Sequence, residues 1–376
     1  AATAMRIAAA TVHPYRLPLR SPWLTAGASV GERSGCLLRL RSDCDHCGYG
    51  DCAPLPASGT ETAAAAIAAL RSLLPPLVGR AAGEALLRLD RFSDGSTPAA
   101  RCAVETALLD LLAQASGVPL AAYLDGHPRR RLDAPVAPPP IRLNAALGSL
   151  RGASASALLA ACNAGFRVLK LKLGVLAIDE EIALLRQLAI ALPPECSLRL
   201  DANRGWPPAA AARFLQACAD LPIEMLEEPL ADPDVDRLQA MQQTTRIALG
   251  VDESIGSLDS EALLARRAVR RLVIKPPRHG GLLAALALAR RAGNAGVECV
   301  ISSSLDSACG ITAAAHLAAA LDSRLAHGLA TSTWLAEDTG SPPRVGNGEL
   351  LLDAAPGLGF VPDRKRSFVP LAGLYC

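Results

Sequence analysis

The chain has 376 residues, of which 51% are hydrophobic and 20% are charged, and its formal net charge at pH 7 is +2. This composition is typical of a well-packed globular protein, and the length favours two or three domains. The small net charge argues against nucleic acid as a partner. No apolar run reaches the roughly 18 residues of a membrane span, so we expect no membrane partner either.

The eleven cysteines are an odd number and are scattered along the chain. They favour a reducing compartment, either the cytoplasm or a plastid stroma, over a disulfide framework. The first twenty residues carry no apolar block ahead of a small-residue cleavage site. Because the first methionine is Met5, we interpret the chain as a trimmed or processed form, or as a piece of a longer polypeptide.

Residues 1–135 predict an α+β domain. Alternation over Leu37–Arg41 and a turn before Gly48–Cys52 predict antiparallel strands. Leu24–Gly31 is rich in small residues and predicts a mobile loop. Helices are predicted over Glu61–Leu74, where two prolines follow, and over Pro98–Ala115, where leucines have helical spacing and a glycine can close the helix.

Cys44, His46 and Cys47, with Cys52 nearby, leave two interpretations open. A closed zinc site needs four ligands, usually from two paired motifs, and no second pair follows. A hairpin tip between two strands explains the same residues. We favour the hairpin over the zinc site.

Residues 136–336 predict a (β/α) barrel of seven or eight units. Arg129–Pro140, basic and then proline-rich, predicts the connector into it. Regular alternation of strand and helix implies parallel strands, and about eight of them favour a closed TIM-type barrel. An open doubly wound sheet is the alternative, although no G-x-G-x-x-G follows the first strand. Residues 337–376 are expected to return to the first domain.

The individual barrel elements follow from the same pattern. Helices are predicted to start with Asp179 as N-cap and at the Pro207-Pro208 pair, and one is predicted over Leu282–Ala292, closed by Gly293. The predicted strands lie near Ile141–Asn144, Phe166–Lys172, Ser197–Asp201, Ile223–Glu227, Ile247–Asp252, Arg271–Lys275, Glu298–Ser302 and Arg324–Gly328.

Three acidic residues, Asp201, Glu227 and Asp252, fall where successive predicted strands end. They are 26 residues (201 to 227) and 25 residues (227 to 252) apart, which is the length of one strand-helix unit. Catalytic residues of such barrels converge at the C-terminal ends of the strands, so the three carboxylates are expected to meet. An all-oxygen ligand set favours Mg²⁺, or Mn²⁺, over zinc. The alternative is that each acid is a helix N-cap or a salt-bridge partner.

Lysines flank these acids. Lys170 and Lys172 are two apart on one predicted strand and therefore share a face, and Lys275 ends the strand after Asp252. A divalent cation destabilises a nearby ammonium and lowers its pKa, so that a lysine can act as a base. This arrangement suits removal of a proton α to a carboxylate. For Lys170, a structural ion pair with one of the acids is an alternative.

The succession Lys-x-Lys, Asp-x-Asn, Glu-Glu-Pro, Asp-Glu-Ser and Lys-Pro, from Lys170 to Pro276, resembles the enolase superfamily and, within it, the muconate-lactonizing subgroup. A lysine base with Mg²⁺ on an enediolate is established chemistry there. Gly48–Pro56 and Arg101–Asp110 resemble the family's capping domain, with Asp51 where a longer acid is usual. The resemblance implies Mg²⁺ ligands at Asp201, Glu227 and Asp252, acid/base lysines at Lys172 and Lys275, a supporting role for Lys170, and substrate contacts at Asn203, Ser303 and Ser304.

Within the subgroup, Ile301–Gly310 and His327–Asp338 resemble the o-succinylbenzoate synthases, particularly the synthase module of plant and algal fused menaquinone/phylloquinone enzymes. This implies a lyase that dehydrates a succinylated hydroxycyclohexadiene carboxylate (SHCHC) to o-succinylbenzoate through an enediolate. It also implies a small-molecule carboxylate substrate, fusion to or association with other quinone-pathway enzymes, and closure of the Leu24–Gly31 loop over the substrate.

Three alternatives to this activity remain. The same two lysines suit an N-succinylamino acid racemase or another muconate-lactonizing-type cycloisomerase, and a barrel without catalysis could serve only for binding. No His–Asp pair replaces the second lysine, as mandelate-racemase-like chemistry requires. The last strand also lacks the Asp-x-Asp with which dipeptide epimerases hold a substrate amine.

Overall fold

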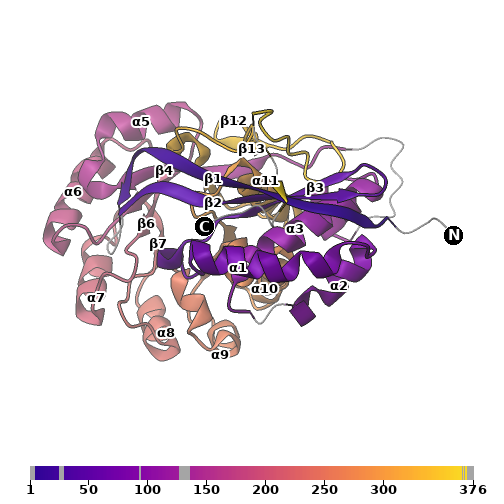
Figure 1. Cartoon of the computed structure of the whole chain (residues 1–376). Helices are drawn as coiled ribbons and strands as arrows, with labels where there is room; N and C mark the ends of the chain where they lie inside the picture. Colours follow the sequence, from indigo (N-terminus) through magenta and orange to yellow (C-terminus); the bar gives the residue numbers. More distant parts are fainter. Residues whose placement is uncertain are drawn as a thin grey trace.

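The computed structural model describes residues 5–24, 29–92, 95–126, 136–365, 367 and 369–370. Two sheets organise these residues: a four-stranded sheet of order β14-β1-β2-β3, and a ten-stranded sheet that contains the barrel. Figure 1 shows the long strands β1 and β2 lying across the molecule, with the barrel helices α5 to α9 curving around one side. Within the described residues, no helix is both long and apolar enough to cross a membrane.

The N-terminal sheet is antiparallel and packs on helices. Strands β1 (Ile7–Leu24), β2 (Ser29–Ser42) and β3 (Cys47–Cys52) pair in chain order. Gly48 and Gly50 let β3 lie directly on the backbone of α3, because a Cβ at either position would collide with a carbonyl oxygen of that helix. The helical elements here are η1 (Pro56–Ser58), α1 (Ala63–Leu73), η2 (Pro75–Leu77), α2 (Ala82–Phe92), α3 (Pro98–Ala115) and α4 (Leu120–Leu124).

Eight parallel strands form a closed barrel. Strand β11 returns to pair with β4, and a bridge between Ser302 and Gly328 joins the ends of β10 and β11. This closure confirms the predicted TIM-type barrel with an N-terminal α+β body and excludes the open sheet. The strands are β4 (Ile141–Ser149), β5 (Val168–Lys172), β6 (Ser197–Asp201), β7 (Ile223–Glu227), β8 (Ala248–Val251), β9 (Arg271–Ile274), β10 (Glu298–Ile301) and β11 (His327–Ala330).

Helices follow seven of these strands. After β11, the short η6 (Ser332–Trp334) is the only helical element among the described residues. The barrel therefore has seven strand-helix units and an eighth strand. Shorter helical turns are η3 (Leu150–Gly152), η4 (Glu253–Gly256) and η5 (Pro276–His279). The α-helices are α5 (Ala155–Asn163), α6 (Ile178–Ile190), α7 (Pro208–Ala217), α8 (Val235–Gln243), α9 (Ser260–Ala265), α10 (Leu282–Asn294) and α11 (Ala308–Ala320).

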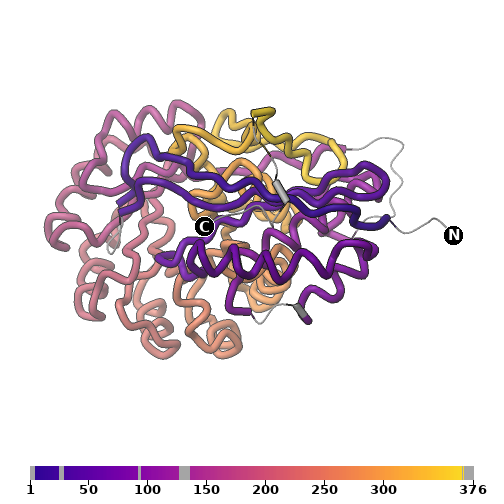
Figure 2. The backbone as a smooth tube through the Cα atoms, in the orientation of Figure 1, coloured from indigo at the N-terminus to yellow at the C-terminus, as the bar shows by residue number. Residues whose placement is uncertain are grey.

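The C-terminal tail contacts both sheets. Strands β12 (Arg344–Gly346) and β13 (Glu349–Leu351) form a hairpin, and β13 pairs antiparallel with β4 of the barrel. Strand β14 (Val369–Pro370) then pairs with β1. In Figure 2 the yellow tail runs along the same side of the molecule as the indigo N-terminal strands. The domain boundaries at 135/136 and 336/337 stay predictions.

Some predicted boundaries are wrong by a few residues. Helix α6 is capped by Ala177, and Asp179 lies in its first turn, where the helix dipole also favours an acid. Helix α10 continues past Gly293 to Asn294, because Gly296, with φ of +76°, supplies the left-handed turn instead. The last barrel strand begins only at His327 rather than at Arg324.

The predicted Leu24–Gly31 loop is too long. Leu24 ends β1 and Ser29–Gly31 begin β2, and Leu24 pairs with Ser29. Residues 25–28 of that segment lie outside the described residues, as does the 129–135 part of the predicted connector. Helix α1 starts at Ala63 rather than Glu61, because the Thr62 hydroxyl caps it by accepting from the backbone N–H of Ala65.

Candidate active site

The C-terminal ends of the strands bring the predicted acids and lysines to one mouth of the barrel. In the parallel ladders Lys172 lies beside Asp201, and Asp201 lies beside Glu227. Asp252 follows the last residue of β8, and Lys275 follows the last residue of β9. The alternating leucines of these strands are buried, so the intervening polar side chains project into the barrel.

Each acid is buried and paired with a lysine. Asp201, Glu227 and Asp252 are 0% exposed. Lys172 Nζ donates to Asp201 Oδ2 and Lys275 Nζ donates to Asp252 Oδ2, both at 2.6 Å. Lys170 Nζ donates to Glu227 Oε2 at 2.6 Å and lies 3.0 Å from Asp201 Oδ2. The ion pair considered for Lys170 is therefore present.

Burial and ion pairing act in opposite directions on the pKa values of these groups. Burial alone would raise the pKa of Asp201 and Asp252, but the neighbouring cations outweigh it and lower both. For Glu227, burial and the charge of Asp201 raise the pKa to about 8. Burial would lower the pKa of Lys170 and Lys275, yet the carboxylates raise both. The lysine pKa lowering expected from the sequence depends on a divalent cation, which would compete with the ammonium groups for these oxygens.

The residues present fit a hard divalent cation. The three acids supply only oxygen donors. Glu227 Oε1 is buried and has no hydrogen-bond partner among the described residues, so a carboxylate oxygen is left to be satisfied. As the side chains stand, no three described His, Cys, Asp or Glu side chains are grouped to hold a metal ion, and the lysine ammonium groups lie among the carboxylates. Binding a cation would therefore require the ammonium groups to move aside.

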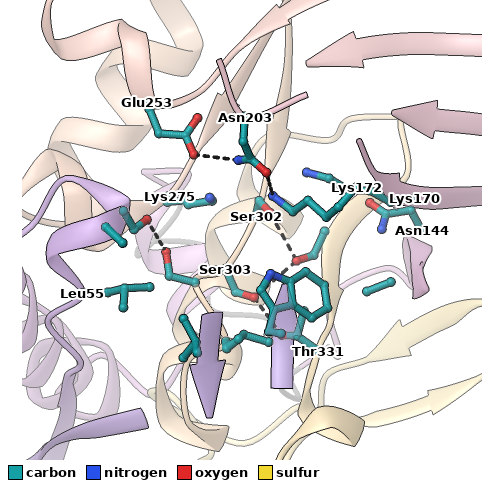
Figure 3. Close-up of a pocket in the computed structure, with 18 of the residues that line it drawn as sticks. Leu55, Asn144, Lys170, Lys172, Asn203, Glu253, Lys275, Ser302, Ser303 and Thr331 are labelled. Carbon is teal, nitrogen blue, oxygen red and sulfur yellow. Dashed lines mark hydrogen bonds between the residues drawn. The ribbon is translucent and has the colours of Figure 1, made fainter. Parts of the chain in front are cut away.

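A pocket of about 470 Å³ opens above these groups. Lys172 and Lys275 point toward each other across it, with Ser302 next to them and with Ser303 and Thr331 on the side facing away from Asn203 (Figure 3). Its described lining contains three lysines, one arginine and one acid, Glu253, and the buried acids that pair with the lysines lie beneath it. The lining residues are Trp23, Val30, Leu55, Ala57, Ser58, Asn144, Ala146, Lys170, Lys172, Asn203, Arg204, Ala231, Glu253, Lys275, Ser302, Ser303, Ser304, Leu305, Gly328 and Thr331.

The three predicted substrate contacts all line this pocket, and Asn203 also touches a lysine. Asn203 Oδ1 accepts from Lys172 Nζ at 2.9 Å, and Asn203 Nδ2 donates to Glu253 Oε1 at 3.2 Å. Ser303 Oγ lies 2.8 Å from the Thr331 hydroxyl. Asn203 has a left-handed φ of +44°, a conformation that asparagine adopts more readily than most residues with a Cβ, and its side chain reaches the lysine.

Sequence reasoning missed several side chains around the acids. Arg278, on the turn after Lys275, donates through Nη1 to Asp252 Oδ1. Glu228 accepts from the backbone N–H groups of Asp252 and Ser254. A basic residue three positions after a strand-end lysine was the one available signal for Arg278. Nothing in the local sequence marks Ser58 or Trp23 as pocket residues, because the N-terminal body delivers them.

The cysteine cluster forms the hairpin between β2 and β3. Ser42 Oγ accepts from the backbone N–H groups of Cys44 and His46, which is a local turn. Cys52 lies at the far end of β3, where it pairs in register with Cys36 and is buried. The described residues therefore favour the hairpin interpretation over the zinc site.

Asp51, the shorter acid in the capping segment, still joins the two bodies. Its Oδ1 accepts from the Tyr15 hydroxyl at 2.5 Å, and its Oδ2 accepts from the backbone N–H of Ser307, directly before α11, at 3.0 Å. The shorter side chain thus reaches a barrel helix because Gly310 leaves space beside it.

Two family descriptions match the chain. The family described as enolase C-terminal domain-like covers residues 153–366. The family described as mandelate racemase / muconate lactonizing enzyme, N-terminal domain, covers residues 6–124. Together they span both the barrel and the N-terminal body.

Individual relatives cover most of the chain. The L-Ala-D/L-Glu epimerase of Clostridium acetobutylicum is 30% identical over 311 residues, which are 81% of this chain and 84% of that protein. The o-succinylbenzoate synthase of Thermosynechococcus vestitus is 34% identical over 314 residues, or 81% and 86%. The solved structure of the dipeptide epimerase of Enterococcus faecalis, complexed with Mg and L-Leu-L-Tyr, has a TM-score of 0.83 and 25% identity, covering 95% and 99% of the two chains.

Proposed function

The chain belongs to the enolase superfamily, whose members are enzymes, and we propose that it removes the proton α to the carboxylate of a small-molecule substrate. The observation that carries this proposal is the opposed pair Lys172 and Lys275 across a pocket floored by three buried carboxylates. The ammonium groups at the pocket surface, together with a bound cation, would suit a substrate that is itself a carboxylate.

We further propose that Mg²⁺, or Mn²⁺, is the cofactor and that Asp201, Glu227 and Asp252 hold it. A bound cation would supply positive charge against the substrate carboxylate and so make its α-proton more acidic. The Enterococcus faecalis epimerase was solved with Mg, and the oxygen donors of this chain suit the same ion.

Lys172 is proposed as the base. Its Nζ contacts both Asp201 Oδ2 and Asn203 Oδ1, and the Asn203 contact would keep it at the pocket when a cation displaces it from Asp201. In its neutral form it takes the α-proton of the substrate. Lys275, on the opposite side, keeps its proton and stabilises the enediolate charge that develops. Lys170 keeps Asp201 and Glu227 from repelling each other.

For the overall reaction we propose dehydration of SHCHC to o-succinylbenzoate. The α C–H bond breaks with its proton passing to Lys172, and the C–O bond of the ring hydroxyl then breaks. The oxygen leaves as water after taking a proton from a lysine, and the ring becomes aromatic. The hydroxyl-rich end of the pocket, with Ser302, Ser303 and Thr331, supports a substrate with an oxygen-rich second arm. The 34% identical synthase supports the same choice.

A second candidate is epimerisation or racemisation, supported by the 30% identical epimerase. Two lysines on opposite sides of the α-carbon could remove a proton from one face and return it to the other. A free dipeptide needs an acid to hold its amine, and Thr331 lies where such an acid pair would follow the last strand. An N-acylated amino acid has no such amine, so an N-succinylamino acid is the stronger form of this candidate.

One experiment separates these reactions. The protein with Mg²⁺ is incubated with SHCHC, with N-succinylamino acids and with dipeptides, and both the diene absorbance and proton exchange in deuterated water are followed. The synthase is supported if the wild type consumes the diene band of SHCHC and Lys172→Ala does not, although that variant still binds Mn²⁺. Exchange of an N-succinylamino acid without dehydration overturns the synthase in favour of the racemase. No reaction with any of them overturns both and favours a binding barrel or a substrate outside these three classes.

For location and partners, we propose a reducing compartment, cytoplasmic or plastid, and association with other enzymes of quinone synthesis. The free, mostly buried cysteines of the described residues are consistent with a reducing compartment. The proposed association with other enzymes follows only from the resemblance of Ile301–Gly310 and His327–Asp338 to fused synthase modules.

A further inference from the structure

A short segment of the N-terminal body, residues 53–59, lies against the candidate active site. It contains η1, and Leu55, Ala57 and Ser58 line the pocket. Two arginines bind this segment from opposite bodies, one belonging to β2 and the other to the turn after β9. Together they make the junction between the N-terminal body and the barrel at the mouth of the pocket.

The first arginine reaches out of the N-terminal body. Arg33 is 2% exposed and donates to the carbonyl oxygens of Ala53 (2.7 Å) and Pro54 (2.9 Å). It also donates to the carbonyl oxygen of Leu305, in the loop after β10, at 3.4 Å. All these acceptors are backbone atoms, so this contact holds the segment in place without depending on the side chains of residues 53 and 54.

The second arginine reaches from the barrel toward the same segment. Arg278 Nε donates to the Ser58 carbonyl oxygen at 2.6 Å, and Nη2 donates to Ser58 Oγ at 2.8 Å. Its remaining nitrogen, Nη1, donates to Asp252 Oδ1. A guanidinium is planar and its donors have fixed directions, so the three contacts fix one orientation together. Ser58→Ala would remove the Nη2 contact and leave the guanidinium held to this segment only through Nε and the backbone carbonyl oxygen of residue 58, so that Arg278 would be freer to turn away from Asp252.

The Ser58 hydroxyl continues the connection to the other side of the pocket. Its oxygen accepts from Arg278, which can only donate, so its hydrogen is available for Ser304 Oγ, 2.9 Å away. Ser58 is buried. Gly59 has a left-handed φ of +86°, and a Cβ there would lie 3.3 Å from Arg278 Nε, so the chain turns away beside the guanidinium.

We propose that Ser58 is a positioning residue that the N-terminal body supplies to the candidate active site. Through Arg278 it fixes the carboxylate of Asp252, and through Ser304 it fixes the loop after β10. The cation site and the substrate contacts are therefore complete only when residues 53–59 are docked on the barrel. The inference uses the proposed function only in naming Asp252 a cation ligand and Ser304 a substrate contact.

The test compares Ser58→Ala with Ser58→Thr, which keeps a hydroxyl, and with Ser72→Ala. Ser72 is an exposed serine on α1 whose hydroxyl, within the part of the chain that the structure describes, bonds to its own helix, so it controls for the loss of any serine hydroxyl. The full-length protein is titrated with Mn²⁺ and followed by electron paramagnetic resonance, kcat and KM are measured with the substrate that the wild type turns over, and the urea midpoint is recorded.

For Ser58→Ala we expect the Mn²⁺ dissociation constant to rise at least threefold and kcat/KM to fall about tenfold, with KM rising and partial recovery in Ser58→Thr. A merely structural serine would lower the urea midpoint without moving the Mn²⁺ affinity. Mn²⁺ binding and kinetics equal to those of Ser72→Ala would overturn the proposal. If the wild type turned over none of the substrates, the proposed function would fail, but the Mn²⁺ titration would still decide the role of Ser58.

A measurement on the wild type covers the case in which Ser58→Ala does not fold. Coupling between two sites is reciprocal, so a cation that fixes Asp252 must also favour the docked segment. We expect hydrogen exchange at the amides of Leu55, Ala57 and Ser58 to slow at saturating Mn²⁺, with no change in α1. Unchanged exchange in residues 55–58 would contradict the coupling.

Discussion

The Glu228 side chain supports Asp252 by binding the backbone N–H of Asp252 rather than the Asp252 carboxylate. The buried carboxylate accepts from Asp252 N at 2.7 Å, Ser254 N at 2.8 Å and Ser254 Oγ at 2.7 Å. Glu228→Ala leaves three buried donors without a partner, and each such group costs about 1–3 kcal/mol. We expect the free energy of unfolding in urea to fall by at least about 3 kcal/mol, and by less in Glu228→Gln, which keeps one acceptor oxygen.

The backbone of Glu228 provides the control for that prediction. Its φ of +47° is left-handed, so alanine at this position keeps the strain whereas glycine relieves it. Glu228→Gly should therefore be slightly more stable than Glu228→Ala although both lack the carboxylate. Equal stability of Glu228→Ala and wild type would show that water replaces the carboxylate without cost.

His316 makes folding sensitive to acid. Its Nδ1 accepts from Ala121 N at 3.1 Å, so the proton of the neutral ring is on Nε2 and faces the Leu358 carbonyl oxygen at 3.0 Å. Burial lowers the pKa of His316 to about 4. An unfolded histidine has a pKa of about 6.5, so between these values the unfolded chain binds more protons. This contribution to stability is present above pH 6.5 and is lost as the pH falls toward 4.

His316→Gln keeps one acceptor and one donor but does not titrate. We expect its urea stability to fall less steeply than that of wild type between pH 6.5 and 4.5, with a difference in slope approaching about 1.4 kcal/mol per pH unit. His327, whose pKa burial lowers to about 3, titrates in the same direction and keeps the remaining slope positive. Parallel pH profiles for variant and wild type would rule out His316 as a source of the acid sensitivity.

At the level of elements, β3 packs directly against the backbone of α3 in the N-terminal body. A Cβ on Gly50 would collide with the Ala103 carbonyl oxygen, which is backbone and cannot rotate away. Gly50→Ala should therefore force the strand off the helix and cost about 1–3 kcal/mol, as overpacking of a core does. Circular dichroism in urea measures this loss.

Gly31 in β2 is the matched control, because a Cβ there meets nothing within 4 Å. Gly31→Ala should leave the unfolding midpoint nearly unchanged or raise it slightly, since alanine restricts the unfolded chain more than glycine. A similar loss in both variants would mean that the cost comes from strand conformation and not from the contact with α3.

The strand ends were predictable, whereas the surroundings of the acids were not. A five-residue strand such as β6 alternates buried leucine with polar residues and ends in an acid, so its period fixes both its face and the position of Asp201. Ser58 and Arg278 are 220 residues apart and meet only because the N-terminal body docks on the barrel. The helix boundaries at Asp179 and Gly293 failed because either residue suits more than one position near a helix end.

Across the whole molecule, a cation at the three acids should stabilise both bodies. The acids are carried by three barrel strands, and Asp252 is connected to the N-terminal body through Arg278 and Ser58. A ligand that binds only the folded state adds RT ln(1 + [L]/Kd), which is about 2.7 kcal/mol at 100 times Kd. We therefore expect chelator-treated protein to unfold at a lower temperature than the same protein with saturating Mg²⁺.

The variants Glu227→Gln and Asp252→Asn separate cation binding from a general effect of salt. Glu227 Oε1 has no protein partner among the described residues, so Glu227→Gln should abolish the Mg²⁺-dependent rise in Tm and turnover together, and Asp252→Asn should do the same. Asp220→Asn is the control, because Asp220 is an exposed acid that pairs with Arg186 far from the mouth. It should keep the full response. Since ionic strength acts on exposed charges in every variant, a rise in Tm that survives in Glu227→Gln would show that Mg²⁺ acts elsewhere on the protein.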